Sequence, residues 1–388
     1  MTVFKKEEVA RDERLFRDPE EFGLEPLEPV DIRKIDDFDG LLAAMARTSF
    51  GGRQVGVAAD VLTSMFSDRT CKRVLTVTGA MTVGKMTLLI VELIERGLVD
   101  IIITTGALQA HGMIEGLGLK HYKLDAAAPR ELHDDAYLAK VGFNRVTDTI
   151  ELEKNFYAAE MVVEEALRDI YEPVPESERP VTLAGSDVMR SLGRVLERRF
   201  PGNRSILSTA ERMGVPIFVP AWTDSELFLE TEIFNYRAEL AGRRRLIQVA
   251  SYLDWREYQD MMTSHGGSLG ILTIGGGVPR NWAQQLGPQL DRLQNEFGRW
   301  PVKRFAYGVR ICPDPAHFGH LSGCTFAEGK SWYKFLPQAR TAEVLADATI
   351  VWPLLMLGVF QRLDKIAAAQ RDSGTQPAAK TYPFKTRS

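Results

Sequence analysis

The sequence predicts an α/β protein of the doubly wound, Rossmann-like type, with a mostly parallel sheet covered by helices on both faces. Short apolar runs alternate with stretches in which apolar residues recur at helical spacing. Several of the apolar runs end in Gly, Thr or Asp, which is typical of strands that meet a ligand at the carboxyl edge of a parallel sheet. With 388 residues, 45% of them hydrophobic, the chain can also bury a large core.

The first third of the chain predicts an arm, a helix pair and a β-turn-α-β unit. Residues 1–35 mix acidic and basic side chains around Pro26 and Pro29 and are expected to form a peripheral arm. Helical spacing continues over 35–65, with a break at 49–53. The unit that follows comprises a strand at Val74–Val77, a glycine turn, a helix at Met86–Arg96 and a strand at Val99–Ile103.

The same alternation continues to the end of the chain. Residues 150–200 are expected to form charged amphipathic helices. Further strands are predicted at 215–219, 269–274, 304–309 and 342–347, with helices at 281–297 and 352–369. Residues 36–370 are therefore predicted to form a single domain, and residues 371–388 a loose polar tail.

Composition excludes several classes of protein. Lys and Arg total 48 against 52 Asp and Glu, so a formal charge of −4 provides no basic field for nucleic acid. The three cysteines, Cys71, Cys312 and Cys324, fit neither a disulfide framework nor a zinc motif. The amino terminus lacks the apolar core of a signal peptide, and no apolar run is long enough to span a bilayer. We therefore expect a cytoplasmic protein without nucleic-acid or membrane partners.

The stretch TGAMTVGKMT, residues 78–87, resembles a phosphate loop only in part. Gly79, Gly84 and Lys85 match three fixed positions of G-x-x-x-x-G-K-[ST]. Met86 offers no hydroxyl to magnesium, and the next strand ends in two threonines instead of a metal-binding Asp. The sequence therefore favours a nucleotide turn that does not serve ATP hydrolysis, in which Lys85 is incidental.

Five stretches carry a resemblance to a known family. They are TTGA at 104–107, PAWTDSE at 220–226, GGGVPRN at 275–281, SGCTFAEGKSWYK at 322–334 and LADA at 345–348. In this order and spacing the chain resembles deoxyhypusine synthase, and its bacterial-type relatives more than the eukaryotic form. The resemblance covers about residues 48–361, and its most specific part is the E-x-x-S-W-x-K segment.

The resemblance implies an NAD enzyme that transfers an aminobutyl group from a polyamine through an imine on an enzyme lysine. The nucleophile of the family falls on Lys334, whose ordinary pKa of about 10.4 must fall before it can attack. Trp332 would hold an alkylammonium by cation–π attraction, and Glu328 would pair with an amine end. The other substrate-binding residues implied are Asn281, Gly276, Glu230 and Ser322.

The cofactor residues implied by the resemblance lie in the glycine turn, at the next strand end and in two acidic positions. They are Gly79, Ala80, Met81, Thr105, Gly106, Ala107, Asp224 and Asp347. The two carboxylates are expected near ribose hydroxyls, which is a common arrangement in dinucleotide sites.

Each of these assignments has a purely structural alternative. Lys334 could be a surface lysine at the start of a strand, and Lys330 is the competing nucleophile. Trp332 could be a core residue, and Asp224 could cap a turn. Gly275, Gly276 and Gly277 could do no more than allow close packing of a strand against a helix.

The chain departs from the eukaryotic pattern at several positions. Asn281 replaces a histidine, and Phe228-Leu229 replaces a Gly-Asp pair, with Glu230 as a substitute carboxylate. The region of His111 replaces an acidic residue, and the loop 316–321 lacks carboxylates. His317 and His320 lie in that loop without a third nearby ligand, so no metal site is predicted.

The predicted function is NAD-dependent aminobutyl transfer from spermidine or putrescine to a small amine, as in homospermidine synthesis. Modification of a protein lysine is the first alternative, since the same imine chemistry serves either acceptor. A catalytically silent protein that binds NAD or polyamine is the second. The resemblance also implies a homotetramer with active sites at a dimer interface.

Overall fold

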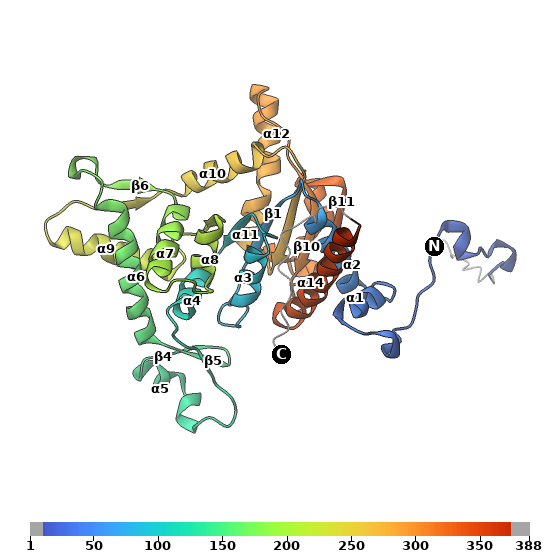
Figure 1. Cartoon of the computed structure of the whole chain (residues 1–388), viewed down its shortest axis with the longest axis horizontal. Coiled ribbons are helices and arrows are strands. Elements are labelled where there is room, and N and C mark those ends of the chain that lie inside the picture. Colours follow the sequence, from blue (N-terminus) through green and yellow to red (C-terminus); the bar gives the residue numbers. More distant parts are fainter. Residues whose placement is uncertain (1–10, 374–388) are drawn as a thin grey trace, which may run out of the picture.

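A computed structural model describes residues 11–373 of the chain and contains a central sheet of six parallel strands (Figure 1). The strands stand in the spatial order β11-β10-β9-β1-β2-β7. Their bounds are β1 Lys72–Val77, β2 Ile101–Thr104, β7 Ile217–Phe218, β9 Leu269–Ile274, β10 Phe305–Ile311 and β11 Phe335–Val344. The predicted α/β fold with a mostly parallel sheet is confirmed.

Alternation along β1 shows why helices cover both faces of the sheet. Leu75 and Val77 face a core formed with α2, α3 and α14, whose bounds are Phe50–Ser67, Thr87–Glu95 and Ala348–Asp372. Val74 faces a second core formed with α10 to α12, at Ser251–Thr263, Gly277–Gln284 and Leu286–Phe297. Because successive side chains of a strand point to opposite faces, an apolar run such as this requires two cores.

The direction of winding reverses next to β1. The chain proceeds from β1 to β2 and β7 on one side, then returns to β9, β10 and β11 on the other. Ligands of such sheets bind outside the carboxyl ends of the strands at the reversal point. Here that point lies between β1 and β9, where Gly276 N donates to Thr78 Oγ1 at 2.9 Å.

The remaining helices lie around this sheet and beside it (Figure 1). They are α1 Phe38–Ala46, α4 Gly106–Gly116, α5 Asp135–Lys140, α6 Glu153–Tyr171, α7 Gly185–Arg199, α8 Ile206–Met213, α9 Glu226–Leu240 and α13 Phe326–Ser331. The predicted helix pair at 35–65 corresponds to α1 and α2, and the charged helices within 150–200 correspond to α6 and α7. No helix among residues 11–373 has the length and apolar character needed to cross a bilayer.

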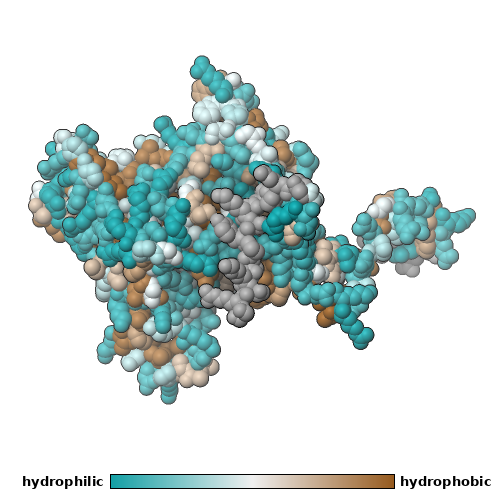
Figure 2. Space-filling view, viewed as in Figure 1, coloured by the Kyte–Doolittle hydropathy of each residue, from teal (hydrophilic) through white to brown (hydrophobic). Residues whose placement is uncertain are grey.

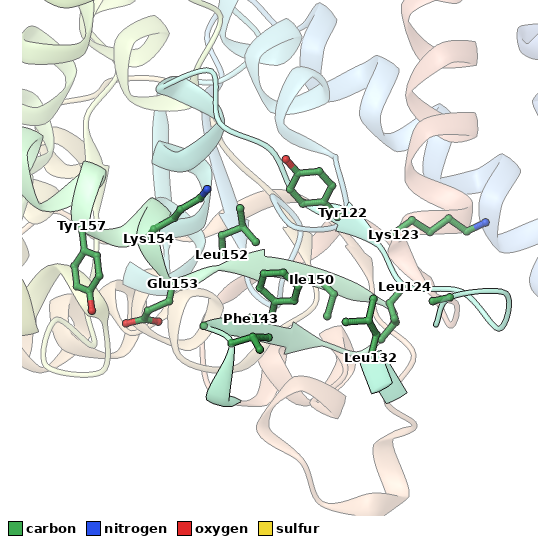
Figure 3. Close-up of a pocket in the computed structure, with 13 residues that line it drawn as sticks. Tyr122, Lys123, Leu124, Leu132, Phe143, Ile150, Leu152, Glu153, Lys154 and Tyr157 are labelled. Carbon is green, nitrogen blue, oxygen red and sulfur yellow. The ribbon is translucent and has the colours of Figure 1, made fainter. Parts of the chain in front are cut away.

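Two small sheets lie beside the main sheet. One is antiparallel, in the order β3-β5-β4, with bounds Tyr122–Lys123, Thr149–Leu152 and Phe143–Val146. The other pairs β6 (Val181–Leu183) with β8 (Ile247–Val249) in parallel. The antiparallel sheet borders a cavity of about 730 Å³ whose lining includes Leu124, Leu132, Phe143 and Ile150 (Figure 3). Apolar side chains gather on the surface over this region (Figure 2), and none of the predicted site residues lines the cavity.

Some element boundaries differ from those predicted. The helix expected at 281–297 is two helices, α11 and α12, that meet at Gln285. The strand expected at 342–347 begins already at Phe335, because Phe335 packs against Phe305 and Phe326 and extends the pairing of β11 with β10. The closing helix starts at Ala348 and continues to Asp372, into the predicted tail.

The arm and the tail are described only in part. Three short 3-10 helices, at Glu13–Leu15, Pro19–Phe22 and Ile32–Lys34, follow one another in the arm, which projects away from the sheet (Figure 1). Residues 1–10 of the arm and 374–388 of the tail lie outside the described residues.

Candidate active site

The turn after β1 is a compact, hydrogen-bonded loop with exposed backbone at its start. Gly79 has φ of +77°, a conformation that glycine adopts without strain. Gly84 N donates to Ala80 O at 2.7 Å and Met86 N to Met81 O at 2.8 Å, so the loop closes on itself. The side of Gly79 and Ala80 that faces solvent is therefore available to a ligand.

Most of the predicted cofactor residues line one cavity of about 490 Å³. Gly79 and Ala80 come from the turn after β1, Thr105 and Ala107 from the start of α4, and Asp224 from the segment before α9. Thr105 is the N-cap of α4, and its Oγ1 accepts a hydrogen bond from Leu108 N at 3.3 Å. The cavity thus opens at the carboxyl ends of β1 and β2, next to the reversal point of the sheet.

Gly106 brings the two walls of this cavity together. A Cβ at this position would lie 2.2 Å from Ser225 Cβ, so α4 and the start of α9 touch only because residue 106 is glycine. Ser225 caps α9 and donates to Trp222 O at 2.9 Å. The capping role considered for Asp224 therefore belongs to Ser225, and Asp224 remains an exposed carboxylate in the cavity.

A second, acidic cavity of about 370 Å³ adjoins the first. His111, Glu226 and Leu229 line both cavities, and Glu230, Glu151 and Glu153 line the second one. Among the described residues, Glu226 Oε2 and Glu230 Oε2 are buried and have no hydrogen-bond partner. Burial and the charge of Glu160 raise the pKa of Glu230 to about 7. A carboxylate in this position would be stabilised by a cationic ligand.

Lys334 is buried, with 7% of its surface exposed, between the end of α13 and the start of β11. Its backbone is held on both sides, since Lys334 N donates to Gly329 O at 3.0 Å and Phe305 N donates to Lys334 O at 3.1 Å. Its Nζ donates to Asn281 Oδ1 at 3.0 Å. The structure thus pairs two of the predicted residues that lie far apart in the sequence.

Two effects lower the pKa of Lys334. Burial is the larger one, and the positive charge of Arg280 adds to it, while Cys324 and Glu328 oppose both. Arg280 is 2% exposed, and its Nε and both terminal nitrogens lack hydrogen-bond partners among the described residues. A buried lysine beside a buried cation favours the neutral amine that nucleophilic attack requires.

Gly276 and Ser322 lie against each other. A Cβ on Gly276 would lie 2.4 Å from Ser322 Cα, so only glycine allows the contact. Ser322 donates a short hydrogen bond to Asp314. Asp314 is a carboxylate that precedes the loop 316–321, where sequence reasoning looked for carboxylates and found none.

The other predicted residues of the segment 328–334 are more exposed than Lys334. Trp332 is 60% exposed and lines a different cavity, with Tyr333 and Arg304. Glu328 is exposed at the surface of α13, although its charge is felt by Lys334. Lys330 Nζ donates to Pro337 O at 3.0 Å, whereas Lys334 is the lysine that bonds to Asn281. Of the two lysines, Lys334 is the one in a polar, buried setting.

Asp347 approaches the glycine turn from another side, and Met81 belongs to the turn itself. Asp347 is the N-cap of α14, where its carboxylate accepts from Thr349 N at 2.7 Å. Thr349 in turn packs close to Gly84, because a Cβ there would lie 3.5 Å from Thr349 Cγ2. Met81 Cε would lie 3.7 Å from a Cβ at Gly79. Asp347 therefore lies beside the turn and Met81 within it, but neither lines the cavity of Asp224.

Sequence reasoning missed a polar network at the wall of the cavity that Asp224 lines. His111 Nδ1 and Glu151 Oε2 are 2.5 Å apart, and His121 Nε2 lies 3.1 Å from Glu151 Oε1. Lys85, taken as incidental, forms an ion pair with Glu115 at 2.6 Å and contacts His121 Nδ1 at 2.8 Å. The only signals in the sequence were two histidines, ten positions apart, after the TTGA segment.

Comparison with known proteins identifies the family. Residues 40–359 match the family model "Deoxyhypusine synthase". "Probable deoxyhypusine synthase 2" of Methanosarcina acetivorans is 30% identical, over 88% of this chain and 91% of that protein. The "Deoxyhypusine synthase-like protein" of Elusimicrobium minutum is 26% identical, over 87% of this chain and 84% of that protein.

A solved structure shares the fold. The crystal structure described as "a putative deoxyhypusine synthase from Entamoeba histolytica" superposes with a TM-score of 0.53 at 17% identity. The match covers 86% of this chain and 97% of that one. The family match over residues 40–359 and the relative of 30% identity show that the chain belongs to the deoxyhypusine synthase family.

Proposed function

We propose that the protein transfers an aminobutyl group from spermidine or putrescine to a small amine through an imine on Lys334, with NAD as cofactor. The observation that carries this proposal is the setting of Lys334, which is buried, bonded to Asn281 and next to the unpaired cation of Arg280. A lysine in a merely structural role would gain nothing from a lowered pKa.

Lys334 acts as the nucleophile of the transfer. Its neutral Nζ attacks the carbon of a substrate imine, the bond from that carbon to the departing amine breaks, and the amine leaves with both protons given up by Nζ. The aminobutyl group is then held as an imine on Lys334. Asn281 orients Nζ through its Oδ1, and a second amine displaces Lys334 by the same steps in reverse.

The cavity of Gly79, Thr105 and Asp224 fits NAD. Exposed backbone at a glycine turn and at a helix start suits a pyrophosphate, and the carboxylate of Asp224 can accept from ribose hydroxyls. NAD bound there would accept a hydride from the carbon beside the amine and later return it, so the transfer involves no net oxidation. The chain's own contribution is to place the substrate carbon against this cavity.

The acidic cavity favours a small diamine as acceptor. Glu226 and Glu230 each place a buried, unpaired carboxylate oxygen beside the cofactor cavity. A buried charge without a partner costs several kcal/mol, so two ammonium groups separated by a short aliphatic chain would stabilise this site. Modification of a protein lysine is the competing function, and it would require only one amine to enter.

The proposal is tested by product analysis. Purified protein is incubated with NAD and spermidine in three arms: with putrescine, with a candidate acceptor protein, and without acceptor. Mass spectrometry is expected to detect homospermidine in the putrescine arm and no mass added to the acceptor protein. A modified protein lysine without homospermidine would favour the competing function, and no product in any arm would favour a silent binding protein.

A further inference from the structure

The network of His111, Glu151, His121 and Lys85 defines where the protons of both histidines lie. A lysine ammonium can only donate, so at 2.8 Å from Lys85 Nζ the Nδ1 of His121 must accept. His121 therefore carries its proton on Nε2, which faces Glu151 Oε1 at 3.1 Å. That contact is too poorly aligned to count as a hydrogen bond, yet the proton on Nε2 points to the carboxylate side.

The same reasoning assigns the tautomer of His111. Glu151 is fully buried, and although burial opposes its ionisation, the hydrogen bond from His111 and the close contact with His121 lower its pKa to about 2. An ionised carboxylate only accepts, so His111 donates from Nδ1. Its Nε2 is left with a free electron pair, and among residues 11–373 no side chain or backbone group forms a hydrogen bond with it.

His111 stands at the junction of the two cavities. It lines both the cavity of Asp224 and the cavity of Glu230. The titratable groups that face it are Glu151 from β5, His121 from the segment before β3, and Glu226 from α9. The side chain is mostly buried, with 17% of it exposed. A base with this geometry can reach a ligand in either cavity.

We propose that His111 takes up the proton of a polyamine ammonium at this junction, with Glu151, His121 and Lys85 as positioning residues. The proposal rests on the proposed function for the nature of the ligand. The N–H bond of the ammonium breaks and leaves its electron pair on the amine nitrogen, and a new bond joins the proton to His111 Nε2. The positive charge moves next to Glu151, and no group is oxidised or reduced.

Physical chemistry explains why such a base is required. Free polyamines are ammonium ions at neutral pH, and an ammonium has no electron pair with which to attack an imine. Asn281 cannot accept and release this proton. Burial alone would lower the pKa of His111, but the hydrogen bond and charge of Glu151 outweigh it and raise the pKa. This makes the imidazole a stronger base.

His111, His121 and Glu151 also have the composition of a metal site, since their ligand atoms lie within 4.8 Å of one another. The protonation pattern argues against it. A histidine that binds a metal through Nε2 normally donates from Nδ1 to an acceptor, whereas here Nδ1 faces an ammonium. The experiments below nevertheless include metal binding as an outcome that would contradict the proposal.

The first test reads the tautomer without any substrate. The chain contains six histidines, so selective labelling of the imidazole ring gives a small set of signals that His111→Asn assigns. We expect His111 to be protonated on Nδ1 at high pH, and Glu151→Gln to lower its pKa. Protonation on Nε2 would overturn the proposal. Because no polyamine is present, this result is independent of the proposed function.

The second test reads the pH profile of transfer. His111→Gln should lower kcat/KM about 100-fold at neutral pH, and the loss should shrink as pH rises and free amine forms in solution. Imidazole added to His111→Ala should restore part of the rate. His317→Gln, in an exposed loop, is the matched control and should behave as the unchanged protein. A loss that is equal at every pH, or tight zinc binding abolished by Glu151→Gln, would contradict a proton-accepting role.

Discussion

Arg280 adds to the effect of burial in lowering the pKa of Lys334, and it does so from a position that solvent does not reach. Its guanidinium is 2% exposed, lies 5.6 Å from the ring centroid of Phe326, and has no hydrogen-bond partner among the described residues. Burial and the charge of Arg310 lower the pKa of Arg280 itself. A buried, unpaired cation is costly for stability, which suggests that it is retained for its effect on the lysine.

Arg280→Met should therefore act in opposite directions on stability and on activity. Removal of the unpaired charge should raise the free energy of unfolding by about 1–3 kcal/mol. The pKa of Lys334 should rise, and the rate of imine formation at neutral pH should fall by roughly 5-fold, with recovery at higher pH. Denaturant titration and the pH dependence of borohydride trapping measure the two effects.

Arg292→Met removes an exposed cation of α12 and is the control for this substitution. It should change neither the free energy of unfolding nor the rate of imine formation. If Arg280→Met instead destabilised the protein, Arg280 would have a partner that a single chain does not provide.

Glu151 should make the free energy of unfolding depend on pH in the acid range. Its folded pKa of about 2 lies below the ordinary value of 4.5, so its contribution is present above pH 4.5 and is lost as pH falls toward 2. Glu151→Gln should lower the free energy of unfolding by on the order of 2 kcal/mol at pH 6. The difference between the two proteins should shrink between pH 5 and pH 3. A difference that stayed constant over this range would show that Glu151 does not act through its charge.

At the scale of elements, the site depends on close approaches that only glycine permits. Gly106 brings α4 within contact of the start of α9, and Gly276 brings α11 within contact of Ser322. Added side chains at these positions would separate the elements that carry Asp224 and Asn281. The glycine runs in the sequence are thus explained by packing as well as by ligand access.

Gly106→Ala tests the first of these contacts. The added Cβ meets Ser225 Cβ at 2.2 Å, so α4 must move away from α9 and widen the cofactor cavity. We expect NADH affinity, followed by fluorescence titration, to fall at least about 10-fold, which corresponds to ~1.4 kcal/mol. Gly51→Ala, where no atom lies within 4 Å of the added Cβ, is the control and should bind NADH normally.

Strands and helices with strong periodicity were predictable from the sequence. The runs that became β1 and β9 are continuous and apolar because both faces of the sheet are covered, and α3 shows clear helical spacing. The small sheet of β3, β4 and β5 was not predicted. Its strands have two to four residues, which is too short for any period to show.

The site was predictable only where a motif carried it. Lys334 and Asn281 were named from separate motifs, and the structure joins them by a hydrogen bond. The pairing of His111 with Glu151 spans 40 positions and depends on how β5 lies against α4, which no local pattern encodes. Lys85 is a similar case. Its partners Glu115 and His121 are separated from it in the sequence by α3 and β2.

At the scale of the whole molecule, the predicted site residues form two groups within one chain. One group lines the cavities of Asp224 and Glu230, and the other surrounds Lys334. Lys334 lines neither of those two cavities, and Trp332 is exposed. This arrangement is consistent with a homo-oligomer in which each active site combines the first group of one chain with the second group of another.

Mixing of inactive variants tests this assembly. If active sites are shared, Lys334→Ala and Asp224→Asn dissociated and reassembled together should regain up to about a quarter of full activity, since half of the pairs are mixed and each mixed pair has one intact site. If both groups of a site come from one chain, the mixture should remain inactive. Light scattering on the same samples gives the number of chains.

The central claim is that Lys334 carries the aminobutyl group, and borohydride trapping followed by peptide mapping tests it most directly. Unchanged protein is incubated with NAD and spermidine, reduced and digested, and Lys330→Ala is treated in parallel. The account predicts that the added mass lies on Lys334 in both proteins, and that Lys334→Ala acquires no label but still binds NAD. Label on Lys330, or label that persists in Lys334→Ala, would contradict the account.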